Sequence, residues 1–66
     1  MEDHLLNIKE VAEILNVSRA LVYSLIKRGD IPTVRIERTI RVRPEDLERY
    51  IHERSLKNHK DLEVDD

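Results

Sequence analysis

Residues 7–29 decide the fold, and they read Asn-Ile-Lys-Glu-Val-Ala-Glu-Ile-Leu-Asn-Val-Ser-Arg-Ala-Leu-Val-Tyr-Ser-Leu-Ile-Lys-Arg-Gly. In both halves of this stretch, apolar residues recur three and four positions apart, which is the spacing of one face of a helix. In the first half they are Ile8, Val11, Ala12, Ile14 and Leu15, and in the second half they are Val22, Leu25 and Ile26. The pattern predicts two amphipathic helices separated by a very short turn.

Residues that begin and end helices stand at the boundaries of these two patterns. Asn7, with Glu10 three positions later, predicts an N-cap with a capping box. Asn16 tolerates the left-handed backbone that ends a helix, Ser18 is a second N-cap, and Gly29 is a second stop. Two helices joined by so short a turn are typical of a helix-turn-helix.

A change of period follows in residues 33–43, Thr-Val-Arg-Ile-Glu-Arg-Thr-Ile-Arg-Val-Arg, where apolar and polar residues alternate. Alternation predicts a β-hairpin. We expect one face to carry Val34, Ile36, Ile40 and Val42, and the other to carry Thr33, Arg35, Arg41 and Arg43. This phase sets Ile36 opposite Ile40 and leaves a three-residue tip, Glu37 to Thr39.

A third helix is predicted to begin at Pro44, with Glu45 and Asp46 in its first turn. Its apolar stripe comprises Leu47, Tyr50, Ile51 and, near the end, Leu56. From residue 57 the chain is charged and ends in acidic residues, so we expect a disordered tail. The expected fold is mainly α with a small β-hairpin: a winged helix-turn-helix (α-turn-α-β-β-α) over residues 1–56, and an acidic tail over 57–66.

Composition excludes several classes of protein. Sixty-six residues make one small domain with a small core. Cysteine is absent, which excludes disulfides, cysteine zinc sites and thiol catalysis, and without Phe or Trp an aromatic platform for single strands is not expected. No apolar run approaches a membrane span. We therefore expect a soluble cytoplasmic domain, associated with the nucleoid if it binds DNA.

Catalytic and metal-binding patterns are also missing from the sequence. The three histidines, His4, His52 and His59, lie far apart with no HExxH arrangement, so no metal site is expected. There is no nucleophile–base set and no glycine-rich phosphate loop. We expect no enzyme activity, no cofactor and no small-molecule ligand.

The charge is distributed in three blocks. Residues 1–17 hold one lysine against four acids (−3), residues 18–43 hold seven bases against two acids (+5), and residues 44–66 hold four bases against eight acids (−4). The net charge of −2 therefore conceals a basic centre, which is the electrostatic footprint of a polyanion-binding surface. The alternative is that these arginines only coat a solvent-exposed face.

These features together predict contacts with double-stranded DNA. The second helix would enter the major groove with its N-terminal residues at base edges, and the arginine-rich hairpin would reach flanking phosphates or the minor groove. The expected DNA-binding residues are Ser18, Arg19, Ala20, Leu21, Tyr23, Ser24, Lys27, Arg28, Arg35, Arg38, Thr39 and Arg41. Arg19 is the first choice for a base contact, because arginine to guanine is the commonest specific pairing, and Arg38 is the first choice for the minor groove.

Several of these side chains have a second interpretation. Tyr23 either donates its hydroxyl to a phosphate or packs against the hairpin. Leu21 either meets a thymine methyl group or completes the core. Ser18 is first of all a cap, and Ala20 and Ser24 either approach bases or form plain surface.

The run from Leu6 to Arg19 resembles the opening of the excisionase-type helix-turn-helix family, which typically reads Leu-x-x-x-Glu-Ala-Ala-x-x-Leu-Gly-Val-Ser. Residues 22–32, Val-Tyr-Ser-Leu-Ile-Lys-Arg-Gly-Asp-Ile-Pro, are similar to the family's Val-Tyr-x-Leu-Ile-x-x-Gly-x-Leu-Pro, and residues 36–47 are similar to its hairpin and third-helix start. The sequence departs from the family at Asn16 and Glu37, where glycine is usual, and at Leu21, where a small polar residue is common.

The resemblance, which covers residues 5–55, implies a winged helix-turn-helix related to the MerR-type DNA-binding domain. It implies either an excisionase, which binds and bends DNA at a mobile-element end beside other copies of itself and an integrase, or a small transcriptional regulator. A third possibility from another class is a protein-interaction module that has lost DNA binding, which the net charge and Glu37 favour.

Overall fold

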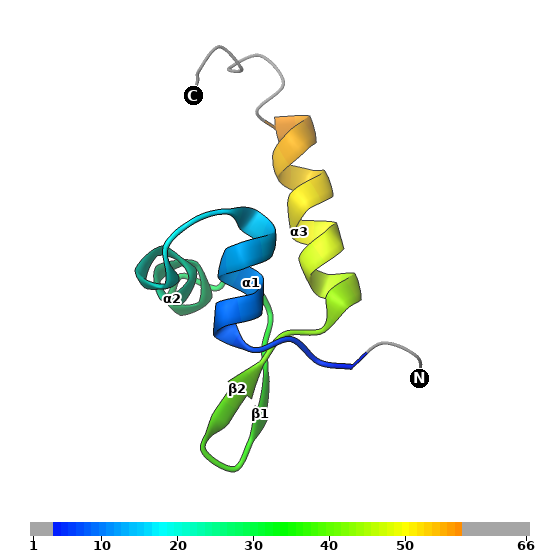
Figure 1. Ribbon diagram of the computed structural model, residues 1–66. Coiled ribbons are helices and arrows are strands. Elements are labelled where there is room, and N and C mark those ends of the chain that lie inside the picture. Colours follow the sequence, from blue (N-terminus) through cyan, green and yellow to red (C-terminus); the bar gives the residue numbers. More distant parts are fainter. Residues whose placement is uncertain (1–3, 58–66) are drawn as a thin grey trace.

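The computed structural model describes residues 4–57, which form three helices and a two-stranded antiparallel hairpin (Figure 1). The elements are α1 (Ile8–Leu15), α2 (Arg19–Lys27), β1 (Val34–Ile36), β2 (Thr39–Arg41) and α3 (Pro44–Lys57). This order confirms the predicted winged helix-turn-helix. Except for Lys57, the last residue of α3, the predicted tail lies outside the described residues.

The predicted helix starts are confirmed. The Asn7 side chain accepts a hydrogen bond from the Glu10 backbone N–H at 2.7 Å, and the Asn7 N–H donates to Glu10 Oε1 at 2.8 Å, which completes the capping box. At α2, Ser18 Oγ accepts from the Leu21 N–H at 3.1 Å. Pro44 is the first residue of α3, where its missing N–H costs no helical hydrogen bond.

The helix stops are confirmed as well. Asn16 has left-handed backbone angles (φ 60°, ψ 47°), and the following Val17 N–H donates to Ala12 O at 3.0 Å. Gly29, after the end of α2, has φ 86°, and the next N–H, that of Asp30, donates to Leu25 O at 2.9 Å. These bonds satisfy carbonyls that a helix end leaves without partners.

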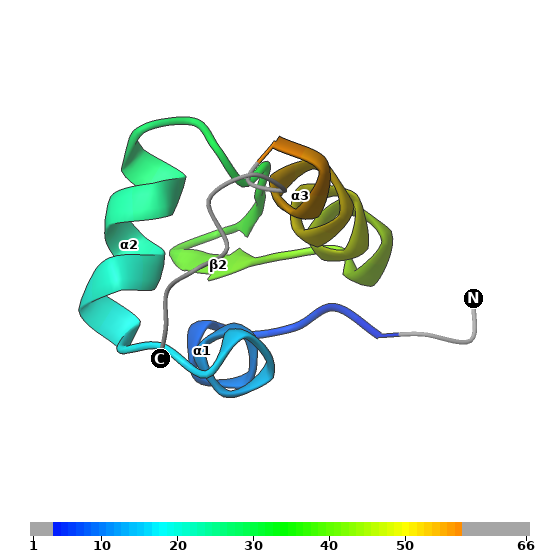
Figure 2. The ribbon, with the colours of Figure 1, turned by 90° about the horizontal axis from the view of Figure 1, so that it is seen from above.

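One hydrophobic core joins all three helices with the connector and the foot of the hairpin. Its buried members are Val11, Ala12, Val22, Leu25, Ile31, Val42 and Leu47. Seen from above in Figure 2, α1, α2 and α3 lie around the axis of the hairpin, which projects below α1 in Figure 1. Ile31, only 2% exposed, was predicted merely as part of the connector, yet it is one of the largest fully buried side chains.

The predicted hairpin register is wrong. Ile36 pairs with Thr39, Arg35 with Ile40 and Val34 with Arg41, so the tip has two residues, Glu37 and Arg38. Paired residues of an antiparallel hairpin share a face, so Arg35 and Arg41 lie on opposite faces and the apolar residues are divided between both. Ile36 is 50% exposed and only Val42 reaches the core, so burial does not enforce the apolar register.

The N-terminal segment adds a pairing that the alternating pattern did not predict. The Leu6 N–H donates to Val42 O at 2.8 Å, and the Val42 N–H donates to Leu6 O at 2.9 Å. Leu6 itself is half-buried and packs against the core. The hairpin is thereby attached at its foot to the residues that lead into α1.

Three residues of the predicted apolar stripes lie at the surface. In α1, Ile14 is 54% exposed, and in α3, Ile51 is 38% exposed, whereas Leu47 is buried and Tyr50 packs against the core. Leu56 is 66% exposed. The apolar stripe of α3 therefore contacts the core only in its first two turns, and the rest of the helix extends beyond the other elements (Figure 1).

Candidate nucleic-acid interface

The outward face of α2 carries six of the twelve residues predicted to contact DNA. Val22 and Leu25 are buried on the inner face and Ile26 packs against the core, so the other positions of the helix turn away from it. The exposed positions are Arg19, Ala20, Leu21, Tyr23, Ser24 and Lys27. Leu21 is 42% exposed, so completing the core is not its role. The side chains in the middle of this face, Ala20 and Ser24, are small, and longer side chains flank them.

Arg28 differs from the other cations of this surface. Its guanidinium donates to the same Asp30 carboxylate oxygen from Nη2 at 2.6 Å and from Nε at 3.2 Å. The Arg28–Asp30 contact is the one ion pair within residues 4–57. The charges of Arg19 and Lys27 have no such partner in this part of the chain, so the field of α2 comes mainly from those two residues.

The hairpin presents its cations in different directions. Arg35 and Arg38 are exposed, whereas Arg41 is half-buried and donates from Nη1 to Ile40 O at 3.0 Å. The Thr39 hydroxyl donates to Ile36 O at 2.7 Å, so its proton is already used within the tip. Glu37 is the first residue of the tip and has φ 56°, a backbone conformation in which glycine is favoured.

A groove of about 340 Å³ connects α2 with the hairpin, and residues of α1 form its third wall. Its lining residues are Asn7, Ile8, Lys9, Tyr23, Arg38, Thr39, Ile40 and Arg41. Tyr23 lines this groove and is also 53% exposed, so its side chain faces both the hairpin side and solvent. Lys9 was not among the predicted site residues, because α1 belongs to the acidic N-terminal block.

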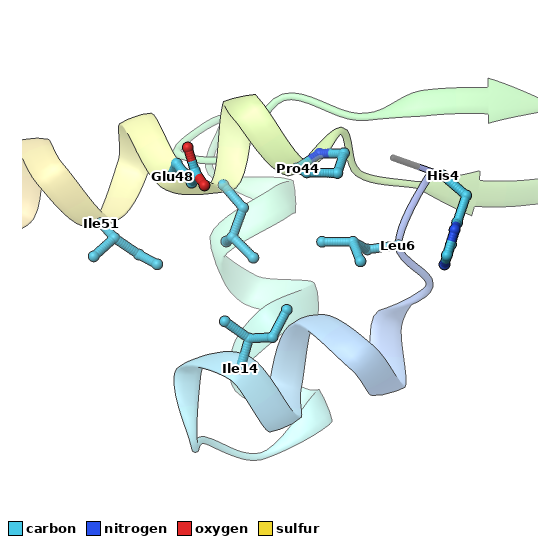
Figure 3. A pocket seen from close by; sticks show the side chains of 7 residues that line it. His4, Leu6, Ile14, Pro44, Glu48 and Ile51 are labelled. Atoms are coloured by element: carbon cyan, nitrogen blue, oxygen red, sulfur yellow. The ribbon is translucent and has the colours of Figure 1, made fainter. Parts of the chain in front are cut away.

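A second groove, of about 310 Å³, is apolar and lies between the N-terminal segment, α1 and α3 (Figure 3). It is lined by His4, Leu6, Ile14, Pro44, Leu47, Glu48 and Ile51. In Figure 2, α2 stands on one side of the molecule, and the N-terminal segment and α3 stand on the other. The apolar groove therefore faces away from the outward surface of α2.

No metal-binding group was found among residues 4–57, where no three His, Asp or Glu side chains gather closely enough to hold an ion. None of the helices within this range is both long and apolar enough to cross a membrane. The described surface includes a groove lined by cations beside α2 and an apolar groove on the opposite side of the molecule.

Comparisons with known proteins agree with this fold. A stretch of 43 residues is 51% identical to the uncharacterised protein YvgK of Bacillus subtilis, covering 65% of this chain and 14% of that protein. A stretch of 38 residues is 45% identical to a Mycobacterium tuberculosis protein, in strains CDC 1551 and H37Rv, whose name reads "Putative DNA-binding protein"; it covers 58% of this chain and 49% of that protein. The chain thus spans about half of the mycobacterial relatives and a much smaller part of YvgK.

No solved structure matches the chain significantly. The family comparison covers more of it, since residues 5–55 match the model described as a helix-turn-helix domain. These residues include α1, α2, the hairpin and most of α3. The chain therefore belongs to the helix-turn-helix domain family.

Proposed function

We propose that this chain binds duplex DNA, with α2 in the major groove and the β1–β2 hairpin against the neighbouring backbone or minor groove. The observation that carries the proposal is the position of exposed cations on adjoining surfaces, none of which forms an ion pair within residues 4–57: Arg19 and Lys27 on α2, and Arg35 and Arg38 on the hairpin. Tyr23 and Arg38 line one groove, so the two surfaces are continuous. Such a basic face is the electrostatic footprint of a phosphate backbone.

In this proposal, base recognition belongs to the start of α2. Arg19 follows the Ser18 N-cap and is exposed, which is the position from which helix-turn-helix proteins reach base edges. Ala20 and Ser24 allow close approach to the groove floor, and Leu21 offers an apolar surface for a thymine methyl group. Lys27, Arg35 and Arg38 serve phosphates, which position the module without reading sequence.

The test is a fluorescence titration with a labelled duplex of about 16 base pairs over a range of salt concentrations. Neutralising ~5 phosphates predicts a log–log slope of affinity against salt near −4. Arg19→Ala should relax sequence preference, whereas Arg38→Ala should weaken all duplexes alike. A wild-type chain with no duplex affinity at low salt would overturn the proposal.

Within DNA binding we propose the role of an excisionase-like accessory factor, related to MerR-type domains, which acts in recombination at a mobile-element end. The support is the resemblance of residues 5–55 to excisionase-type sequences. A single module makes few base contacts, so several copies on adjacent sites, or an integrase as partner, would supply specificity. The runner-up is a small transcriptional regulator.

DNA bending separates these two roles. Duplexes carrying a bound site at their centre or at their end should migrate differently on a native gel if the protein bends DNA, and tandem sites should fill cooperatively. A straight complex with independent sites would favour the regulator.

The second candidate class, a protein-interaction module, is favoured by the apolar groove with its exposed Ile14 and Ile51, and it requires that duplex binding fail.

A further inference from the structure

Three cations from two distant parts of the chain line the groove between α1, α2 and the hairpin. They are Lys9 of α1, Arg38 of the tip and Arg41 of β2. Among residues 4–57, no acidic residue lines this groove and no ion pair involves any of the three cations. Like charges around one groove repel one another, and an anion bound between them would offset that repulsion.

The polar groups that line the groove divide into those that are already hydrogen-bonded and those that make no hydrogen bond within residues 4–57. The Asn7 side-chain oxygen and backbone N–H are engaged in the capping box, and the Thr39 hydroxyl proton is given to Ile36 O. The Lys9 ammonium and the Tyr23 hydroxyl make no hydrogen bond within residues 4–57. Donors without acceptors therefore remain on α1 and on α2, facing the same groove as the Arg38 guanidinium.

Arg41 is held more firmly than Lys9 and Arg38, the other two cations of the groove. It is half-buried, and its Nη1 already donates to Ile40 O at 3.0 Å. A guanidinium has five N–H donors, so this bond orients the group and leaves other donors for a ligand. Its charge is thereby fixed in the wall of the groove.

We propose that this groove seats one phosphodiester group of the DNA backbone, with Lys9, Tyr23 and Arg38 as its ligands and Arg41 as a fixed charge behind them. The inference rests on the proposed function, and it extends the interface to α1. A duplex phosphate supplies acceptor oxygens on a single negative centre, which suits donors that converge from three elements. Because the ligands come from α1, α2 and the hairpin, one seated phosphate sets the depth and register of α2 in the major groove.

The experiment measures duplex affinity against salt for the wild type, Lys9→Gln and the control Arg49→Gln. Arg49 is an exposed cation of α3 that does not line the groove, so its replacement removes the same charge elsewhere. Lys9→Gln should weaken binding roughly tenfold on every sequence, the size of a hydrogen bond to a charged group, and reduce the salt slope by about 1. Arg49→Gln should leave both nearly unchanged.

A second measurement identifies the phosphate. One phosphate at a time is replaced by a neutral methylphosphonate along each strand of the duplex. At one position this replacement should weaken binding of the wild type but hardly weaken binding of Lys9→Gln any further. Arg38→Gln should likewise be insensitive to the methylphosphonate at that same position. Tyr23→Phe should weaken binding without changing the slope of log affinity against log salt concentration. If the wild type binds DNA but Lys9→Gln behaves like Arg49→Gln, or Lys9 and Arg38 couple to different phosphates, the phosphate seat is wrong while DNA binding stands. A wild type that binds no duplex overturns both.

Discussion

Arg28 and Asp30 form a two-pronged ion pair, in which Nη2 and Nε of the arginine donate to the same Oδ2 at 2.6 and 3.2 Å. Arg28 is the C-cap of α2, and Asp30 lies just beyond Gly29 at the start of the connector. The pair therefore places a carboxylate at the C-terminal end of the proposed DNA-binding face. A phosphate that uses Arg28 must compete with that carboxylate.

Removing the carboxylate charge should therefore strengthen DNA binding. We expect Asp30→Asn to raise duplex affinity several-fold, because it releases the Arg28 guanidinium and removes a like charge from the interface. The free energy of unfolding should change by less than about 1 kcal/mol, since exposed ion pairs contribute little. Fluorescence titration and thermal unfolding measure the two effects. Glu48→Gln on α3 removes the same charge away from α2 and should leave affinity unaltered.

Burial separates two isoleucines of the connector and hairpin. Ile31 is 2% exposed and Ile36 is 50% exposed, so the same truncation has different costs. Ile31→Ala should lower the free energy of unfolding by about 2–5 kcal/mol, a large part of the roughly 3–10 kcal/mol expected for a chain of this length. Ile36→Ala should lower it by less than about 1 kcal/mol. Urea unfolding of both variants checks this contrast, and equal effects would contradict the burial of Ile31.

The hairpin shows where sequence reasoning was limited. The alternation of Val34, Ile36 and Ile40 predicted a buried apolar face, but the hairpin extends past the core and only Val42 is enclosed. Without a core to select one face, loop geometry decides the register, and two-residue connections are the commonest in hairpins. The pattern was informative only where side chains were buried.

The backbone at the tip yields a prediction about stability. Glu37 has φ 56°, a conformation that costs a side-chain-bearing residue about 1–2 kcal/mol. We expect Glu37→Gly to raise the free energy of unfolding by roughly 1 kcal/mol. Arg38, its neighbour in the same tip, has no positive φ, so Arg38→Gly should lower stability through added chain entropy. Opposite signs in denaturant unfolding are the expected result, and two losses of stability would contradict the tip geometry.

The capping box at the start of α1 should be a coupled pair. Asn7→Ala removes an acceptor for the Glu10 N–H and should cost about 1 kcal/mol of unfolding free energy. Glu10→Ala should cost less once Asn7 is already alanine, because the two bonds support the same turn. A double-mutant cycle by thermal unfolding measures this coupling. Glu13→Ala, an exposed position further along the same helix, serves as the uncoupled control.

The helix boundaries were predictable because they depend on local chemistry. Asn7, Ser18 and Gly29 act on residues three or four positions away, and all three do what their types suggest. The exposed face of α2 followed from the same periodicity. Lys9 was missed because its groove is completed by Tyr23, Arg38 and Arg41, which no spacing in the sequence connects to it.

The Leu6–Val42 pairing has a consequence for synthesis of the chain. Residues 6–29 leave the ribosome before the hairpin and α3 and contain the whole helix-turn-helix, but its inner faces pack against Ile31, Val42 and Leu47. Pairing Leu6, before α1, with Val42, just after β2, closes the intervening residues into a single loop. The entropy lost on closing this loop is offset only when the residues at both ends are present and paired. We therefore expect the nascent chain to fold in one step, after Val42 and Leu47 have emerged, and not helix by helix.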